Sequence, residues 1–591
     1  MPASGIPLAS ALRQAFREGY SWSDLRADAL AGLVVGVVAL PLSMALAVAS
    51  GVPPQHGLYT ALVAGGLIAL LGGSRVQVSG PTAAFVVLLA PVSARFGLAG
   101  LLIASLMAGA LLVAMGLARM GRFIEFVPYP VTTGFTAGIA VVIATLQAKD
   151  FLGLQVAGNP EHYLDRVRAL AQALPTANPW DAAVGGLTLA LLLLWPRLTS
   201  RVPAPLVALA IAAAVAAVCA ARVPGFAVAT IGSRFHSLGP DGQLLAGIPR
   251  QLPSFAWPWS RPGAGGVAPG LSFELVRDLL PSAFAIAMLG AIESLLSAVV
   301  ADGMTGRKHD PDAELVAQGA GNLVAPFFGG FAATGALART ATNVRAGARS
   351  PLAAVVHALS ILAALLLLAP LLGFLPMASL AALLLLVAWH MSERKHVRYV
   401  LQRAPRSDVL VLLACFGLTV VFDMVVAVTA GLVLSSLLFI RRMAEVSGVT
   451  LVGDSHPHLD APLPRGVVLY DVAGPLFFGA AQSALSALET VEKRGLRAVV
   501  LDVADVPAID ATGLVNLESL IARLNRDGVK VILGGAQEQP MRAFARAGWR
   551  NRKGRLRIFR DVGRAIDNAR TFAETPLSRR GPEESPTAGT D

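Results

Sequence analysis

The sequence predicts a polytopic α-helical membrane protein with an α/β domain at its C-terminal end. Of the 591 residues, 55% are hydrophobic and only 14% are charged, whereas a soluble domain averages roughly 45–50% and about 25%. The mean hydropathy is +0.64. Such a chain has too little polar surface to cover itself in water, so we expect most of it to lie in a bilayer. After Arg442 the composition changes to that of a soluble unit.

The charged residues and cysteines exclude several classes of protein. The formal net charge is +11, but the basic residues are scattered in short loops rather than gathered with aromatic residues, so no nucleic-acid partner is expected. Cys219 and Cys415 both lie inside apolar runs, which argues against a disulfide scaffold and a cysteine metal cluster. Residues 1–27 are polar and lack the apolar run and cleavage site of a signal peptide.

Fourteen apolar segments are expected to cross the membrane, in two sets of seven. A bilayer core about 30 Å thick needs roughly 20 apolar residues per helix, and charged or Pro/Gly-rich breaks separate the segments. They are residues 30–50, 57–71, 81–93, 98–117, 131–147, 182–195, 206–221, 280–300, 315–328, 334–344, 352–372, 377–389, 409–421 and 425–440.

The distribution of lysine and arginine predicts that both termini lie in the cytoplasm. Short cytoplasmic loops carry an excess of these residues, and here every second connection is basic. The connections expected inside carry Arg75, Arg119, Arg122, Arg197, Arg201, Arg307, Lys308, Arg345, Arg349, Arg394, Lys395, Arg398, Arg403 and Arg406. The short hairpins expected outside, 51–56, 329–333 and 422–424, carry none.

The C-terminal part alternates between strand and helix patterns. Strands are expected at residues 466–472, 498–503 and 529–534, and helices at 480–493 and 513–525. This alternation is typical of a compact α/β unit. We therefore divide the chain into a cytoplasmic N-terminal segment (1–27), a transmembrane domain (28–443), an α/β domain (444–570) and a disordered tail (571–591).

Catalytic signatures are absent from the sequence. It contains no GxxxxGK phosphate loop, no HExxH and no GxSxG motif, which argues against an ATP-driven pump and a membrane hydrolase. His456 and His458 are expected to be solvated in a linker rather than to bind a metal. We expect no enzyme activity, no metal and no cofactor other than a coupling ion, either a proton or sodium.

Two polar interruptions at corresponding positions predict the functional site. The third segment opens with Gly80, Pro81 and Thr82 after an alternating polar lead, and the tenth opens with Gly335 before a short helix. Short, interrupted helices at equivalent positions of two repeats mark the binding sites of many transporters. If both are half-helices, their unpaired N–H groups and positive dipole ends would face one cavity and attract an anion.

Arg339 and Thr82 are the side chains expected to complete this anion site. Arg339 lies on the first turn of the second half-helix and would add a planar cationic fork. The alternative is an arginine that extends to the membrane surface or pairs with a neighbouring helix. Thr82 could offer its hydroxyl to the anion, or it could be a helix cap or bond within its own helix.

Glu293 is the candidate coupling residue, because apolar residues flank it for at least a turn on either side. A carboxyl group at membrane depth is neutral, paired or titrating, and a titrating group can carry a proton. The alternative is a structural hydrogen bond to a neighbouring helix or to Arg339. In the first segment Pro41 interrupts the helix, so Leu42, Ser43 and Leu46 could close the cavity, or Pro41 could be a kink alone.

Several motifs together resemble the bacterial SulP anion permeases over nearly the whole chain. They are Gly57-Leu-Tyr59, Gly72-Gly-Ser-Arg75, Ser79-Gly-Pro-Thr-Ala83, Glu293-Ser-Leu-Leu-Ser-Ala298, Ala301-Asp302-Gly303, Glu314-Leu-Val-Ala-Gln-Gly319, Thr334-Gly-Ala-Leu-Ala-Arg-Thr340 and Gly347-Ala-Arg-Ser-Pro351. The resemblance implies a fourteen-span, seven-plus-seven inverted repeat as in uracil-permease-like proteins, with a mobile core domain and a gate domain. It also implies a cytoplasmic STAS domain, whose signature resembles Leu501–Asp505 followed by Ile509–Leu514.

The resemblance also assigns site residues. It places the anion among Gly80, Pro81, Thr82, Gly335, Ala338, Arg339, Leu42 and Leu46, and it matches Glu293 to an acidic position implicated in proton or sodium coupling. Many members have Gln where Leu42 stands and an aromatic residue where Leu46 or Thr82 stands, so the identity of the anion is not inherited. In some STAS relatives a phosphorylated Ser occupies the position of Thr512, which makes Thr512 either a phosphorylation site or a helix cap.

The sequence thus predicts a symporter in the inner membrane of a bacterium, carrying sulfate by family default and driven by protons through Glu293. A four-carbon dicarboxylate such as succinate or fumarate is an alternative substrate. Bicarbonate with sodium is less favoured, because the coupling carboxyl belongs to Glu rather than Asp. A passive anion channel, or an anion sensor that signals through the STAS domain, is the alternative of another class. A homodimer and a regulatory partner at the STAS domain are implied by the resemblance.

Overall fold

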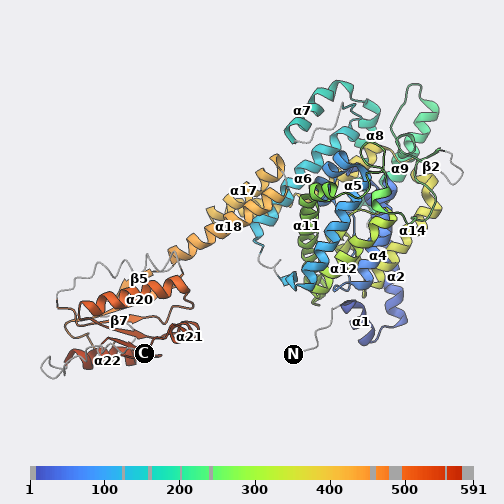
Figure 1. The fold of residues 1–591 in the computed structure, drawn as a ribbon. Coiled ribbons are helices and arrows are strands. Elements are labelled where there is room, and N and C mark those ends of the chain that lie inside the picture. Colours follow the sequence, from blue (N-terminus) through green and yellow to red (C-terminus); the bar gives the residue numbers. More distant parts are fainter. Residues whose placement is uncertain are drawn as a thin grey trace. The chain divides into compact units, whose positions relative to one another are not determined.

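The structure is a computed structural model of the chain. It describes residues 8–122, 127–156, 163–199, 202–238, 244–422, 424–446, 448–452, 459, 461–477, 495–552 and 555–574. The chain divides into two compact units, Met1–Val433 and Leu434–Asp591. Figure 1 shows the elements of both units in sequence colours.

The first half of unit 1 is almost entirely helical. After a short helix, α1 (Ser10–Arg17), its elements are α2 (Trp22–Ala49), α3 (Pro54–Tyr59), η1 (Thr60–Ala64), α4 (Gly65–Leu71), β1 (Ser79–Gly80), α5 (Ala83–Leu117), α6 (Tyr129–Phe151), α7 (Tyr163–Ala173), η3 (Leu174–Thr176), α8 (Pro179–Leu198) and α9 (Ala204–Arg222).

The second half of unit 1 follows a long connection with little regular structure. This connection contains α10 (Ile231–Arg234), the hairpin of β2 (His236–Leu238) and β3 (Leu244–Ala246), and η4 (Pro258–Ser260). The helices then continue with α11 (Phe273–Thr305), α12 (Pro311–Val324), η5 (Ala325–Phe328), β4 (Thr334–Gly335), α13 (Leu337–Arg345), α14 (Leu352–Leu372), α15 (Met377–Met391), α16 (Arg394–Arg403), α17 (Arg406–Val421) and α18 (Met424–Val446). The boundary between the two units falls within α18, after Val433.

Each of the fourteen expected segments is helical over most of its length. Within the described part of the chain, nine helical stretches are long and apolar enough to cross a membrane by length and composition alone. The third and fourth segments appear as one helix, α5, which is broken at Gly97 by a backbone φ of 70° and ψ of −166°. The number of spans and their orientation stay predictions.

Glycines allow the helices of unit 1 to pack backbone against backbone. A Cβ atom on Gly319 of α12 would lie 2.6 Å from the backbone nitrogen of Val113 on α5, and one on Gly32 of α2 would lie 2.3 Å from the carbonyl oxygen of Ala353 on α14. Small residues at such crossings are typical of helix packing in membranes, where dispersion contacts must replace the hydrophobic effect. These two crossings hold α5 against α12 and α2 against α14.

Unit 2 contains a five-stranded sheet in the order β5-β6-β7-β8-β9, where β5 (Gly448–Leu451) is antiparallel to β6 (Val467–Ala473). The strands β6, β7 (Ala498–Asp502), β8 (Lys530–Gly534) and β9 (Leu556–Ile558) are parallel. Alternate strand residues face opposite sides: Leu501 and Leu533 pack with α20 (Ala511–Arg526) and α21 (Glu538–Arg546), while Val500 and Ile532 pack with α22 (Val562–Glu574).

The three expected strands and the helix at 513–525 are therefore confirmed as β6, β7, β8 and α20. The expected helix at 480–493, the histidines His456 and His458, and most of the expected tail lie outside the described residues. The unit also contains β5, β9, α21 and α22, which are not among the expected elements.

Candidate anion-binding site

The two interrupted segments meet at a short crossing. β1 and β4 pair antiparallel, with Ser79 opposite Gly335 and Gly80 opposite Thr334. The backbone nitrogen of Ala336 extends the pairing by donating to the carbonyl oxygen of Val78 over 2.9 Å. Because the strands are antiparallel, α5 and α13 leave the crossing in opposite directions, with their N-terminal ends on either side of it.

Neither of these helix ends is capped by a side chain. Thr82 occupies the N-cap position of α5 and Ala336 that of α13, and neither makes a side-chain cap hydrogen bond. The first N–H groups of a helix have no partner within the helix, and its N-terminal end carries a partial positive charge. Both ends can therefore donate to an anion. The expected start at Pro81 is corrected slightly, since α5 begins at Ala83.

Arg339 reaches across the crossing from the first turn of α13. Its side chain is 2% exposed. Nη2 donates to the carbonyl oxygen of Pro81 over 2.9 Å and to Oγ of Ser43 over 3.4 Å. Nε and Nη1 have no hydrogen-bond partner within the described residues. The expectation that Pro81 and Arg339 lie together is confirmed, and the alternative of an arginine that extends to the surface is wrong because the side chain is buried.

Gly80 leaves room for this guanidinium group. A Cβ atom on Gly80 would lie 2.6 Å from Nη1 of Arg339. The obstructing atom is the end of a flexible side chain, so the guanidinium would move while the backbone stayed in place.

We expect Gly80→Ala to raise the KM for the transported anion about tenfold, because each 1.4 kcal/mol of lost binding is a factor of ten. The melting temperature should change little. Uptake kinetics and a melting curve of the purified protein measure both, with Gly303→Ala as control, since a Cβ there meets no atom within 4 Å. An unchanged KM would contradict the placement of Arg339.

Thr82 connects the first half-helix to Glu293. Its Oγ1 donates to Oε2 of Glu293 on α11 over 2.7 Å. Thr82 is buried and Glu293 half-buried. The alternatives of a side-chain helix cap or a bond within its own helix are therefore wrong for Thr82. Glu293 does make a hydrogen bond to a neighbouring helix, so a structural role and a coupling role both remain compatible with the geometry.

The first-span residues lie differently with respect to Arg339. Ser43 supplies the hydroxyl that accepts from Arg339. On the same helix, Leu46 is fully buried and Leu42 is half-buried, whereas Ala338, on α13, is exposed. Helix α2 continues through Pro41, so Pro41 does not end the helix, although it lacks the N–H group that would bond to the carbonyl oxygen of Val37. Gly335 is confined by Gln77, whose Nε2 would lie 2.1 Å from a Cβ at that position.

A buried carboxylate outside the expected site residues, that of Glu314, supports the crossing. Glu314 on α12 is 1% exposed and accepts five hydrogen bonds. The donors are the backbone nitrogens of Gly73 and Ser74, Nε2 of Gln77, Oγ of Ser294 and Nε2 of Gln318, at 3.0 to 3.3 Å. Nε2 of Gln318 also donates to Oγ of Ser79 in β1 over 2.9 Å. Glu314 thus fixes the segment that leads into β1.

One sequence signal could have revealed this network. Glu314, Gln318 and Asn322 recur every fourth residue of α12, and all three are buried. Residues four apart share one face of a helix, so a polar face on an otherwise apolar segment indicates buried hydrogen bonds.

We expect Glu314→Gln to lower the free energy of unfolding by about 2–4 kcal/mol. Hydrogen bonds to a charged group contribute roughly 1.5–3 kcal/mol each, and the NH2 group of glutamine cannot accept from the donors that bond to one of the two carboxylate oxygens. A thermal melt of the purified protein should show a drop of several degrees. The exposed Glu274→Gln on α11 is the matched control. Equal melting temperatures for the two variants would refute the role given to Glu314.

Two further expectations concern Thr512, which lies in unit 2, and metal binding. In unit 2, Asp510 caps α20 by accepting from the backbone nitrogen of Gly513 over 2.7 Å. Thr512 is exposed on the first turn of that helix, so the helix-cap interpretation of Thr512 is wrong. Within the described ranges, no group of three His, Cys, Asp or Glu side chains could hold a metal ion.

Family models match most of the chain. A model described as "Sulfate permease family" matches residues 25–415, and a model described as "STAS domain" matches residues 458–565. The first of these ranges contains every residue of the β1–β4 crossing, together with Arg339 and Glu293.

Individual relatives and solved structures agree with these matches. The Bacillus subtilis (strain 168) protein YvdB, provisionally named a sulfate transporter, is 41% identical over 92% of this chain and 97% of its own. The bicarbonate transporter BicA of Picosynechococcus sp. is 29% identical over 91% and 92%. Among solved structures, the murine anion transporter Slc26a9 in its inward-facing state covers 96% of this chain and 94% of its own, with a TM-score of 0.81 and 19% identity. This last likeness concerns the fold alone.

Proposed function

The chain belongs to the sulfate permease family, and on this premise we propose that it imports sulfate together with protons, binding the anion at the β1–β4 crossing and the proton at Glu293. The family and its relatives are transporters of anions. The substrate, the coupling ion and the residues that carry them are our proposal.

The buried guanidinium of Arg339, of which only Nη2 has hydrogen-bond partners among the described residues, is the observation that carries the proposal. A buried charge is costly unless it is paired and hydrogen-bonded, yet Nε and Nη1 of Arg339 have no partner within the described residues. Two uncapped helix ends lie beside it. A tetrahedral oxyanion could accept both from an unpartnered N–H group of Arg339 and from the amides of the two helix ends, because its four oxygens point in different directions.

Glu293 is suited to couple a proton to this anion. Arg339 contacts Pro81 and Glu293 contacts Thr82, so the two charged groups act on neighbouring residues of one segment. A dianion beside Arg339 and an ionised Glu293 leaves two negative charges in excess, and a proton on Glu293 reduces the excess to one. Since buried like charges raise the proton affinity of a carboxyl group, sulfate and a proton should bind cooperatively.

Bicarbonate is the second candidate, because BicA of Picosynechococcus sp. is similar over most of its length. A monoanion beside Arg339 and an ionised Glu293 leaves one negative charge in excess, compared with two for a dianion, so it gives a weaker electrostatic reason for a proton to enter with it. At this site, the binding of a dianion should therefore favour the binding of a proton more strongly than the binding of a monoanion does.

Uptake into proteoliposomes that contain the full chain tests the function. We expect radiolabelled sulfate to accumulate against its gradient when the external medium is acidic, and a protonophore should abolish the accumulation. Labelled bicarbonate and succinate, measured in the same vesicles, should not accumulate. Downhill flux alone would indicate a channel, and accumulation of bicarbonate in place of sulfate would overturn the proposed substrate.

The remaining features of the proposal rest on the family. We place the protein in the inner membrane of a bacterium, with both termini and the STAS domain in the cytoplasm. Movement of a core domain against a gate domain would expose the site to each side in turn. Dimerisation and a regulatory partner at the STAS domain are proposed on the same basis, and so is modification of the exposed Thr512.

A further inference from the structure

A second polar cavity lies at the end of unit 1 that carries the N-terminal segment. It has a volume of about 470 Å³ and is lined by residues that include Glu18, Tyr20, Arg75, Arg307 and Arg349. These residues come from the turn after α1, the lead into β1, the turn after α11 and the turn after α13. Volumes of 300–1,000 Å³ are typical of small-molecule sites.

The cavity combines three arginines with two carboxylates. Arg75, Arg307 and Arg349 contribute three positive charges and Glu18 and Asp24 two negative charges, which leaves a formal charge of 3 − 2 = +1. All three arginines belong to loops that the positive-inside pattern places on the side of the N-terminus. The structure brings these loops, which are far apart in the sequence, to one cavity.

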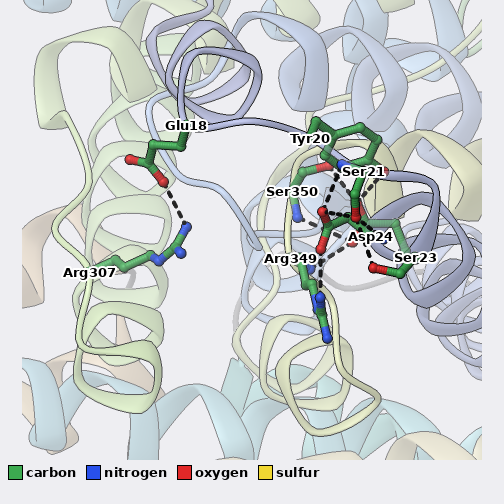
Figure 2. A network of polar contacts seen from close by, with 9 residues as sticks. Glu18, Tyr20, Ser21, Ser23, Asp24, Arg307, Arg349 and Ser350 are labelled. Atoms are coloured by element: carbon green, nitrogen blue, oxygen red, sulfur yellow. Dashed lines mark hydrogen bonds and ion pairs between the residues drawn. The ribbon is translucent and has the colours of Figure 1, made fainter.

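Glu18 occupies the position of an oxyanion between two of these arginines. Its Oε1 lies 2.5 Å from Nη2 of Arg75, and its Oε2 lies 3.6 Å from Nη1 of Arg307. Figure 2 shows Glu18 pointing toward Arg307, apart from the group formed by Ser21, Asp24 and Arg349. The contact with Arg75 lowers the pKa of Glu18, so this carboxylate is ionised at neutral pH.

Glu18 is held less firmly than Asp28, the buried carboxylate near the start of α2. It follows the last residue of α1, where the negative end of the helix dipole repels it, and its side chain is 46% exposed. By contrast, Asp28 is fully buried and accepts from the backbone nitrogens of Arg349 and Ser350, from Ser350 Oγ and from Tyr20 Oη. Glu18 can therefore leave its arginines without disrupting the segment.

The cavity is connected to the β1–β4 crossing by the elements that build the crossing. Arg75 lies four residues before Ser79 of β1, and Arg349 lies ten residues after Arg339. Thr305, which also lines the cavity, ends the helix that carries Glu293. At 1.5 Å per residue, roughly 18 Å of helix separates the two.

We propose that this cavity is a second anion site, in which Arg75 and Arg307 bind a small doubly charged tetrahedral oxyanion in exchange for the carboxylate of Glu18. This inference rests on the proposed function for the choice of sulfate as the probe and for the route that the anion takes from Arg339. An anion that leaves Arg339 toward the N-terminal side would meet this site next, with Glu18 returning to the arginines as the anion departs.

Equilibrium binding of radiolabelled sulfate to the purified full chain in neutral detergent tests the proposal. The measurement is made in an Arg339→Gln background, so that binding at the crossing does not contribute. We expect saturable binding that Glu18→Gln tightens about tenfold by removing the competing carboxylate, and that Arg307→Gln weakens about tenfold. Arg345→Gln, an exposed arginine at the end of α13, should leave it unchanged.

Three results would overturn the second site. They are the absence of saturable binding in the Arg339→Gln protein, equal effects of Arg307→Gln and Arg345→Gln, and weaker binding in Glu18→Gln. Binding without transport of sulfate would support the second site and count against the proposed substrate. Failure of the second site and failure of the proposed substrate therefore give different results.

A lipid phosphate offers the same chemistry as a free oxyanion. The same binding is therefore measured in discs of neutral phosphatidylcholine and in discs that also contain phosphatidylglycerol. We expect equal affinities in both. If the anionic lipid abolishes sulfate binding, a headgroup phosphate occupies the arginines and the free-anion site is refuted.

Discussion

Replacement of Arg339 by glutamine is expected to abolish concentrative sulfate uptake, with kcat/KM lower by about 100-fold or more. Truncating one partner of a buried charged contact costs about 2–5 kcal/mol, and each 1.4 kcal/mol is a factor of ten. Arg339 is 2% exposed, and Nε and Nη1 have no partner within the described residues. Glutamine keeps polarity but loses both the charge and the fork. Initial rates of sulfate uptake into proteoliposomes measure the loss.

Two further variants separate the charge of Arg339 from its shape. Arg339→Lys keeps the charge without the planar fork, so we expect intermediate activity, about tenfold below the native protein. Arg345→Gln removes an exposed arginine from the same helix and should be neutral. A melting curve shows whether each variant is folded. If Arg339→Gln is folded and transports sulfate at the native rate, the anion does not bind at this guanidinium.

Replacement of Glu293 by glutamine is expected to uncouple transport from the proton gradient. Sulfate should no longer accumulate against its own gradient, whereas exchange of external for internal sulfate should persist, because the anion site itself remains. Glutamine still accepts a hydrogen bond from Thr82, which donates over 2.7 Å in the native protein, so the local structure should survive. The measurement compares accumulation and exchange in the same vesicles.

The matched control for Glu293 lies on the same helix. Glu274→Gln makes the same chemical change at an exposed position in the first turn of α11, and it should leave both accumulation and exchange intact. Proton-driven accumulation by Glu293→Gln would show that the proton binds elsewhere. Loss of exchange as well as accumulation would assign Glu293 a structural role.

The sequence predicts the helices well, because apolar runs are local signals. It places their ends less well. The apolar pattern begins at Leu30, yet α2 begins at Trp22, where Ser21 and Asp24 form a capping box. Similarly, α11 begins at Phe273 after the cap Ser272, several residues before the apolar run. Polar first turns do not register in a hydropathy count, although the capping residues were visible in the sequence.

The site is predictable to the extent that it depends on backbone breaks. Gly80, Pro81 and Gly335 mark the crossing, because glycine and proline punctuate helices wherever they occur. The contacts that give the site its chemistry are not local. Thr82 and Glu293 are 211 residues apart, and Ser43 and Arg339 are 296 apart. No periodicity in one sequence specifies such pairs, so only the structure identifies the partner of each polar side chain.

A structure of the protein with bound selenate, a heavier analogue of sulfate, tests the central claim most directly. Anomalous scattering locates the selenium atom. We predict a peak at the β1–β4 crossing, with its oxygens within hydrogen-bond distance of Nε or Nη1 of Arg339 and of the first N–H groups of α5 and α13, besides any peak in the cavity of Arg75 and Arg307. Selenate bound in the membrane domain away from the β1–β4 crossing, with Arg339 still bonded only to Pro81 and Ser43, would contradict it.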